Sequence, residues 1–141
     1  MNDTDRLRYL RIALVVTGVI AIACVYPLML VWPSGWAWES GYAAGNSAGH
    51  SDYALMIVGI YATLGVFLIL AARDPLAHRS LIGFAVWSSV VHGGIMAVQS
   101  LTEAGHRGHL LGDVPALFII AIVLAVLTPR RGKGASPRRE P

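Results

Sequence analysis

Four apolar blocks, separated by short polar stretches, make up most of the chain. They cover approximately residues 12–32, 54–72, 81–101 and 110–127. A helix needs about 20 apolar residues to cross the roughly 30 Å of hydrocarbon in a bilayer, and the first three blocks come close to that length. The fourth block contains Asp113 and is long enough only if its ends lie in the membrane interfaces. The pattern predicts an all-α membrane protein, an antiparallel four-transmembrane-helix bundle.

The amino-acid composition agrees with this interpretation. Of the 141 residues, 55% are hydrophobic and 13% are charged, and the mean hydropathy is +0.60. Soluble domains carry about 25% charged residues. We therefore expect one four-span membrane domain, residues 1–131, followed by a basic, disordered cytoplasmic tail, residues 132–141. The lipid bilayer is then the main partner, with anionic headgroups near the tail, and the net charge of +3 does not indicate nucleic-acid binding.

Lys and Arg residues are distributed unevenly among the stretches that flank the four blocks. Ten of the eleven lie before the first block, between the second and third blocks, or in the tail. Only Arg107 lies in one of the other two stretches. Because cytoplasmic loops of membrane proteins are enriched in Lys and Arg, this asymmetry predicts that both termini are cytoplasmic.

The first block has an alternative interpretation as a cleaved signal peptide. Three arginines precede it, and "AIAC" faintly resembles a lipoprotein cleavage site at Cys24. However, the apolar sequence continues to Trp32, whereas polar sequence normally follows a cleaved signal. We therefore expect the block to be retained as a span. The single cysteine also excludes an intramolecular disulfide and a thiol–disulfide enzyme that needs a cysteine pair.

The third block carries polar side chains that are costly inside a bilayer. At 100° per residue, one face of the predicted helix carries Ser88, Ser89, His92, Met96 and Gln99. Such a face is expected to point into the bundle rather than toward lipid. Tyr61 in the second block differs from His92 in depth by only about 3 Å, so we expect a hydrogen bond between them.

This intramembrane polar cluster allows two interpretations. Its members can be interhelical hydrogen-bonding groups, worth about 0.6–2 kcal/mol each, or they can form a proton path, a quinone-type ligand site or a cofactor site. A b-type haem usually needs two axial ligands, and His92 is the only histidine deep in a block. Met56 and Met96 are the possible second ligands, but Met56 points away from the Tyr61 face. We expect no cofactor.

A second group of candidates lies in the stretch "EAGHRGHLLGD". It contains His106, His109 and Asp113, and His50 lies in the other outer stretch. Imidazole and carboxylate groups can bind zinc or copper. The spacing is loose and three glycines interrupt it, so we expect solvated loop residues and no metal site. A membrane enzyme that uses these histidines is an alternative hypothesis.

Small residues and helix caps suggest how the helices pack. Strips of small side chains, which allow close approach in membranes, are expected on the first helix (Ala13, Thr17, Ala21, Cys24) and on the second (Ala54, Gly65, Ala72). Asp74 before Pro75 is typical of a helix start. The short turn that contains them predicts that the second and third helices are antiparallel neighbours.

Three motifs carry a resemblance to a known family: "RDPLAHRSL", "WSSVVHGGIMAVQ" and "RGHLLGDVP". With their surroundings they resemble a family of small bacterial four-span membrane proteins classed only as a domain of unknown function, over most of residues 7–131. The resemblance implies a bacterial inner-membrane protein and carries no activity, substrate or cofactor. The leading hypothesis is a non-catalytic accessory or oligomerising component, which has its own copies or another membrane protein as partner. The alternative is a redox-associated or quinone-type ligand-binding protein that uses His92, Tyr61 and Gln99.

The charge asymmetry gives a direct test of topology. Reporter fusions after Gly45 and after Arg131 are expected to show opposite sidedness, with the first outside and the second in the cytoplasm, because only the second follows a basic stretch. Alkaline phosphatase and fluorescent-protein activities measure this. If both fusions report the same side, the four-span arrangement is wrong.

Overall fold

The computed structural model describes residues 2–25, 52–102 and 104–129, with the side chains of 52–55 and 104–106 left out of the description. These ranges form four α-helices: α1 (Asp3–Ala23), α4 (Asp52–Ala71), α5 (Arg79–Thr102) and α6 (Asp113–Leu127). A short 3₁₀-helix, η2 (Ala104–Leu110), lies between α5 and α6. No strand occurs within the described ranges. The all-α prediction is confirmed.

The helix boundaries follow the apolar blocks closely for α4 and α5 and less closely for the other two helices. Helix α1 begins at Asp3, well before its block, because the charged first turns continue the helix outside its apolar part. Its expected continuation to residue 32, including Pro27, lies outside the described residues. Helix α6 begins at Asp113 rather than residue 110, since η2 and a turn occupy the positions before it. The 3₁₀-helix also corrects the expectation of a loop there.

Two helical stretches are long and apolar enough to cross a membrane by length and composition. They are Arg79–Thr102 and Arg107–Leu127, the second of which includes part of η2. Met56–Ala71 is a shorter apolar helix. The part of the first predicted span after residue 25 lies outside the described residues.

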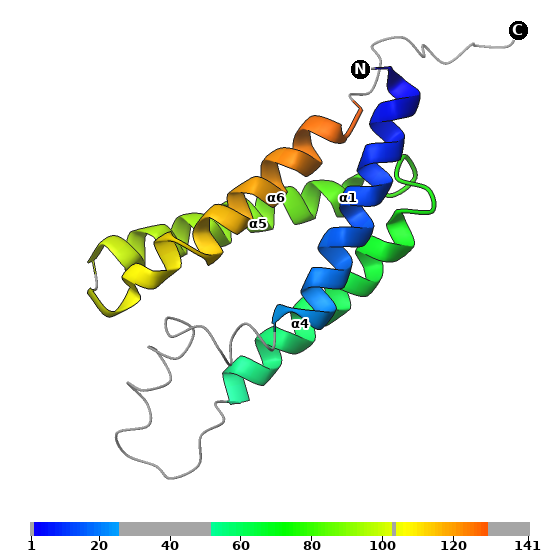
Figure 1. Cartoon of the computed structure of the whole chain (residues 1–141). Coiled ribbons are helices and arrows are strands. Elements are labelled where there is room, and N and C mark those ends of the chain that lie inside the picture. The colour runs from blue at the N-terminus through cyan, green and yellow to red at the C-terminus, as the bar shows by residue number, and fades with distance from the viewer. Residues whose placement is uncertain (1, 26–51, 103, 130–141) are drawn as a thin grey trace, which may run out of the picture.

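The four helices form two pairs, α1 with α4 and α5 with α6 (Figure 1). The pairs meet at the end that holds the N-terminus and the turn after α4, and they diverge toward the opposite end. Helices α4 and α5 therefore touch little, although a short turn connects them. The expectation that they are antiparallel neighbours holds only next to this turn. There, Asp74 Oδ1 accepts a hydrogen bond from the Ala77 backbone N–H at 3.3 Å. This bond closes a turn, whereas α5 begins only at Arg79, so the expected helix start at Asp74 and Pro75 is wrong.

The buried core lies at the end where the two pairs meet. Its cluster draws on all four helices and the start of the turn: Leu10, Leu14, Leu68, Ala71, Ala72, Ile82, Ala85 and Leu124. Pro75, in the turn, is also fully buried. The joined end is therefore the packed part of the described structure, and it fixes where the helices begin to diverge.

Two arginines fasten the C-terminal end of α6 at this same end. Arg6 of α1 donates from Nε and Nη2 to the carbonyl oxygen of Val126, at 3.2 and 2.6 Å. Arg79, the first residue of α5, donates from Nη2 to the carbonyl oxygen of Pro129. The last carbonyls of a helix have no partner within it and carry partial negative charge, so cations are stabilising there. Helix α6 is thereby tied to both α1 and α5.

Helices α1 and α4 come closest at a pair of glycines, Gly18 and Gly65. A Cβ added at Gly18 would lie 2.6 Å from the Gly65 carbonyl oxygen, and one added at Gly65 would lie 2.6 Å from that of Gly18. Ala21 packs beside the pair. The predicted small-residue strips were right about Ala21 and Gly65, which lie at this contact. The strip on α1 omitted Gly18, and the buried face of that helix consists of Leu10, Leu14, Gly18 and Ala21. Cys24, placed in the strip, is exposed.

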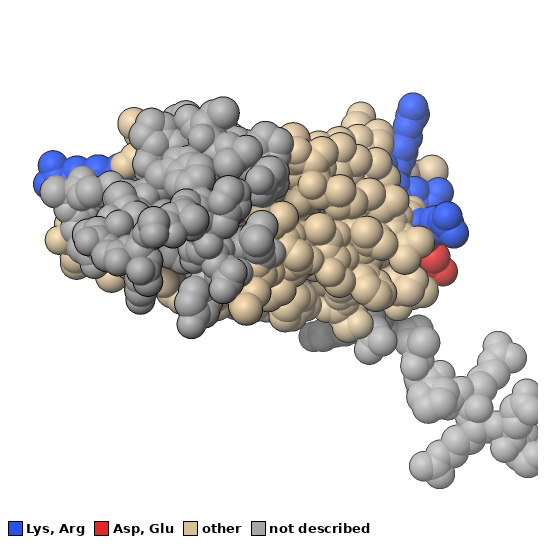
Figure 2. Space-filling model, turned by 90° about the horizontal axis from the view of Figure 1, so that it is seen from below, with Lys and Arg blue, Asp and Glu red and all other residues tan. Residues whose placement is uncertain are grey.

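Most of the helix surface away from the joined end is apolar. Large hydrophobic side chains are exposed on all four helices, among them Val16, Ile60, Trp87 and Ile119, with exposed fractions of 50%, 68%, 69% and 60%. On the face shown in Figure 2, Lys and Arg side chains lie at the two ends of the described part, and other residues form the surface between them. This distribution is the reverse of that on a soluble helical protein, where such patches are small.

The glycine contact predicts position-specific effects of alanine. Gly18→Ala and Gly65→Ala are each expected to destabilise the protein by about 1–3 kcal/mol, because the new Cβ meets backbone that cannot move easily. The matched control is Gly59→Ala, also in α4, where a Cβ has nothing within 4 Å. Unfolding in bicelles measures the difference. Equal stability of the Gly65 and Gly59 variants would contradict the α1–α4 packing.

Candidate functional site

The predicted hydrogen bond between Tyr61 and His92 is present in the structure. The Tyr61 hydroxyl oxygen lies 3.4 Å from His92 Nδ1, and the two rings meet edge to face with centroids 6.0 Å apart. The hydroxyl donates when Nδ1 carries no proton and accepts when it does. A separation of 3.4 Å is long for a hydrogen bond. The pair thus joins α4 to α5 where the two helices are already moving apart.

The polar face of α5 is less enclosed than the sequence analysis expected. His92 and Gln99 are exposed, whereas Ser88, Ser89 and Met96 are half-buried. The expectation that the whole face points into a bundle interior is therefore wrong for His92 and Gln99. The physical reason is the pairing of the helices: α5 packs on α6, and a Cβ at Gly93 would touch Leu117 and Phe118 of α6. Because α4 diverges from α5, the face of α5 that carries His92 stays exposed.

Most of the remaining polar groups on α5 bond within their own helix. Ser88 donates to the carbonyl oxygen of Ala85 at 3.2 Å. The Met96 carbonyl oxygen accepts a bond of 2.7 Å from the hydroxyl of Ser100, which is fully buried. The side chains of Ser89 and Gln99 have no hydrogen bond to another described residue. Ser100 was not among the candidates because it lies outside the polar face drawn around His92.

A histidine–aspartate pair closes the end of the α5–α6 hairpin that holds η2. His109 Nδ1 lies 2.5 Å from Asp113 Oδ2, and the His109 side chain is buried. Asp113 stands in the first turn of α6, where a carboxylate is stabilised by the helix dipole. The expectation that His109 is a solvated loop residue is wrong. The i,i+4 spacing of His109 and Asp113 could have predicted their contact on a helical turn. Gly112 between them suggested a loop instead.

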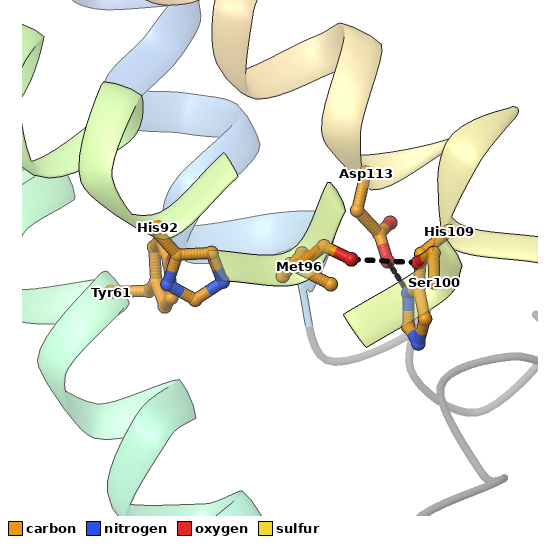
Figure 3. A network of polar contacts seen from close by, with 6 residues as sticks. All are labelled: Tyr61, His92, Met96, Ser100, His109 and Asp113. Atoms are coloured by element: carbon orange, nitrogen blue, oxygen red, sulfur yellow. Dashed lines mark hydrogen bonds and ion pairs between the residues drawn. The ribbon is translucent and has the colours of Figure 1, made fainter. Parts of the chain in front are cut away.

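The polar residues form one row from α4 to the start of α6 (Figure 3). Tyr61 and His92 lie at one end, Ser100, His109 and Asp113 lie at the other, and Met96 lies between them. Among the described residues, however, no hydrogen bond connects His92 to Ser100 or Asp113. The row therefore consists of two separate polar groups rather than a continuous hydrogen-bonded path.

The described residues do not assemble a metal site. No group of three His, Cys, Asp or Glu side chains comes together among them. His109 and Asp113 form a pair, whereas zinc sites have three or four protein ligands. His50 and the side chain of His106 lie outside the description. His92 and Met96 are one turn apart on the same helix, so they cannot supply axial ligands to opposite sides of a haem.

A family model matches residues 4–140, almost the whole chain, and is described as a family of unknown function (DUF6632). The chain belongs to this family. The predicted resemblance to a domain of unknown function is therefore confirmed. No curated protein and no solved structure matches the chain. Membership in DUF6632 covers α1 to α6 together and assigns no reaction to any of the polar residues.

The contact between Tyr61 and His92 predicts energetic coupling. His92→Ala removes a hydrogen-bonding group and leaves the Tyr61 hydroxyl without its partner, with an expected loss of about 1 kcal/mol because the bond is long. His92→Gln should recover part of this loss. In a double-mutant cycle with Tyr61→Phe, the two losses should be less than additive by at least about 0.5 kcal/mol. Unfolding in bicelles measures all four members.

Tyr9 offers a matched control for this cycle, since it is exposed on α1 and has no contact with His92. A cycle that combines His92→Ala with Tyr9→Phe should be additive. If the Tyr61 cycle is additive as well, the two side chains do not interact.

Proposed function

We propose that this protein is a four-span protein of the bacterial inner membrane and works as a non-catalytic accessory or oligomerising component. Both termini face the cytoplasm in this proposal. The observation that carries it is the apolar surface of the helices, which the described chain does not cover by its own packing. Such a surface is stable against lipid or against other apolar helices, and not against water.

The charges at the two ends support the proposed orientation. The joined end carries Arg6, Arg8, Arg73 and Arg79, whereas η2 at the opposite end carries Arg107. Because Lys and Arg concentrate on the cytoplasmic side of membrane proteins, the joined end is the one that faces the cytoplasm in our proposal. The helices then diverge toward the outer side of the membrane.

The polar contacts within the described chain support a non-catalytic role. Tyr61 bonds to His92, Ser100 bonds to a carbonyl of its own helix, and His109 bonds to Asp113. The first is an interhelical bond, a type worth about 0.6–2 kcal/mol in membrane proteins; the second lies within one helix, and the third links η2 to the first turn of α6. Catalysis by general acid and base needs groups that converge on one reacting atom, and the row in Figure 3 is instead divided into two.

One observation favours a second function. His92 is exposed on the side where α4 and α5 diverge, and the amide of Gln99 is exposed two turns farther along the same helix. A small hydrophobic ligand with a carbonyl group, of the quinone type, could accept hydrogen bonds from these two side chains. In this second proposal the polar face of α5 is a ligand site rather than a structural contact.

Analysis of the purified full-length protein separates the two functions. The proposed role predicts no absorbance in the visible range and no stoichiometric quinone in a solvent extract measured by mass spectrometry. Light scattering should show particles with more than one 15.1 kDa chain. A ligand present at one per chain, lost in His92→Gln and kept in the exposed control His78→Gln, would replace the proposal by the second function. A ligand-free single chain would contradict the oligomerising role.

A further inference from the structure

An open groove runs between α1 and α6 on the surface of the joined end. Tyr9, Ile12 and Ala13 of α1 form one wall, and four residues of α6 form the other: Ile122, Val123, Val126 and Leu127. Apart from the Tyr9 hydroxyl, all of these side chains are apolar. At 1.5 Å per residue the groove extends about 6–8 Å along the helices. Its walls are exposed, with Ile12 at 51% and Ile122 at 61%.

Arg6 of α1 lies beside the end of the groove where it bonds to α6. Arg6 bonds to the carbonyl of Val126, which also lines the groove, and Arg79 bonds to the carbonyl of Pro129 three residues later. Within the described part of the chain, neither guanidinium has a carboxylate partner, although Asp3 and Asp5 lie in the first turn of α1. A carbonyl oxygen leaves the positive charge of an arginine largely uncompensated. The groove thus combines an apolar floor with a positive end.

We propose that this groove binds an anionic phospholipid, with the phosphate at Arg6 and the first part of one acyl chain between α1 and α6. Arginine matches the geometry of phosphate oxygens through several parallel donors. Arg6 precedes Tyr9 by three residues, which places it about 4.5 Å nearer the cytoplasmic end. Tyr9 then stands between the phosphate and the acyl chain, where tyrosine is favoured in membranes.

The charge distribution favours this occupant over a neutral lipid. A neutral lipid would fill the apolar walls but leave Arg6 without an anion. Occupation of the groove by a second copy of the chain is an outcome that the experiment distinguishes. The inference rests on the proposed membrane location. Only in a bilayer would a lipid phosphate lie at the level of Arg6 with the acyl chain at the level of the groove.

Native mass spectrometry of the full-length protein in detergent tests the proposal. Titration with phosphatidylglycerol and with phosphatidylcholine should show one phosphatidylglycerol bound per chain with a clear preference over phosphatidylcholine. Arg6→Gln should weaken phosphatidylglycerol binding about fivefold, since one cation near a lipid phosphate contributes about 1 kcal/mol. Arg6→Lys keeps the charge and should retain the preference. Ile122→Trp should weaken the binding of both lipids by filling the groove.

Two matched variants control for general effects. Arg8→Gln removes an exposed arginine of α1 that makes no contact with α6, and Ile119→Trp enlarges an exposed residue of α6 that does not line the groove. Neither should change the binding of phosphatidylglycerol. Equal binding of the two lipids, or equal effects of Arg6→Gln and Arg8→Gln, would overturn the proposal. A dimer that Ile122→Trp dissociates would show that a second copy occupies the groove, and would also overturn it.

The inference and the proposed function fail in different ways. If reporter fusions show that the chain does not cross the membrane four times, the proposed function fails. If the chain is correctly inserted and shows no preference for phosphatidylglycerol, only the lipid site fails.

Discussion

The close contact between Gly18 and Gly65 determines how the rest of the described chain is arranged. It brings the backbones of α1 and α4 together until each glycine faces the carbonyl oxygen of the other. The Gly65 face of α4 thereby packs on α1 rather than on α5. Helix α5 packs on α6 instead, with Gly93 against Leu117 and Phe118. The two pairs can then meet only at the end where the turn after α4 connects them, and the Tyr61 side chain must reach across the divergence to contact His92.

The same constraint explains why the polar contacts matter. Helices in lipid gain little from burying leucine, because the acyl chains are as apolar as the side chain. Van der Waals contact between small residues, hydrogen bonds and charge therefore hold such helices together. The described chain spreads these contacts along its length: Arg6 and Arg79 hold the C-terminal end of α6 and Pro129 at the joined end, the Tyr61–His92 bond lies in the middle, and the His109–Asp113 pair lies at the far end. The first two groups link different helices, and the third links η2 to the start of α6.

The hydrophobic pattern predicted the elements well because each apolar block is long and its ends are marked by charges or by Asp–Pro. The Tyr61–His92 contact also followed from the sequence, since depth in a helix is fixed by the rise per residue. The exposure of His92 did not follow, because it depends on which helices pair, and this is decided by Gly18, a residue outside the predicted strip. The buried position of His109 was hidden by the glycines around it, which indicate a loop although the chain forms a 3₁₀-helix there.

Helix α6 is the element on which both ends of the structure depend. Its first turn carries Asp113, the carbonyl of Val126 in its last turn accepts bonds from Arg6, and the carbonyl of Pro129 just after the helix accepts one from Arg79. Negative charge at the N-terminus of a helix and positive charge at its C-terminus are each stabilising by about 0.3–1 kcal/mol. The interior of α6 is wholly apolar, so these terminal contacts are its polar connections to the described remainder of the chain. Asp113 holds His109 at one end of the polar row, and Arg6 borders the groove beside α1. A shift of α6 along its axis would therefore change the polar row and the groove together, which makes this helix the physical link between the two candidate sites.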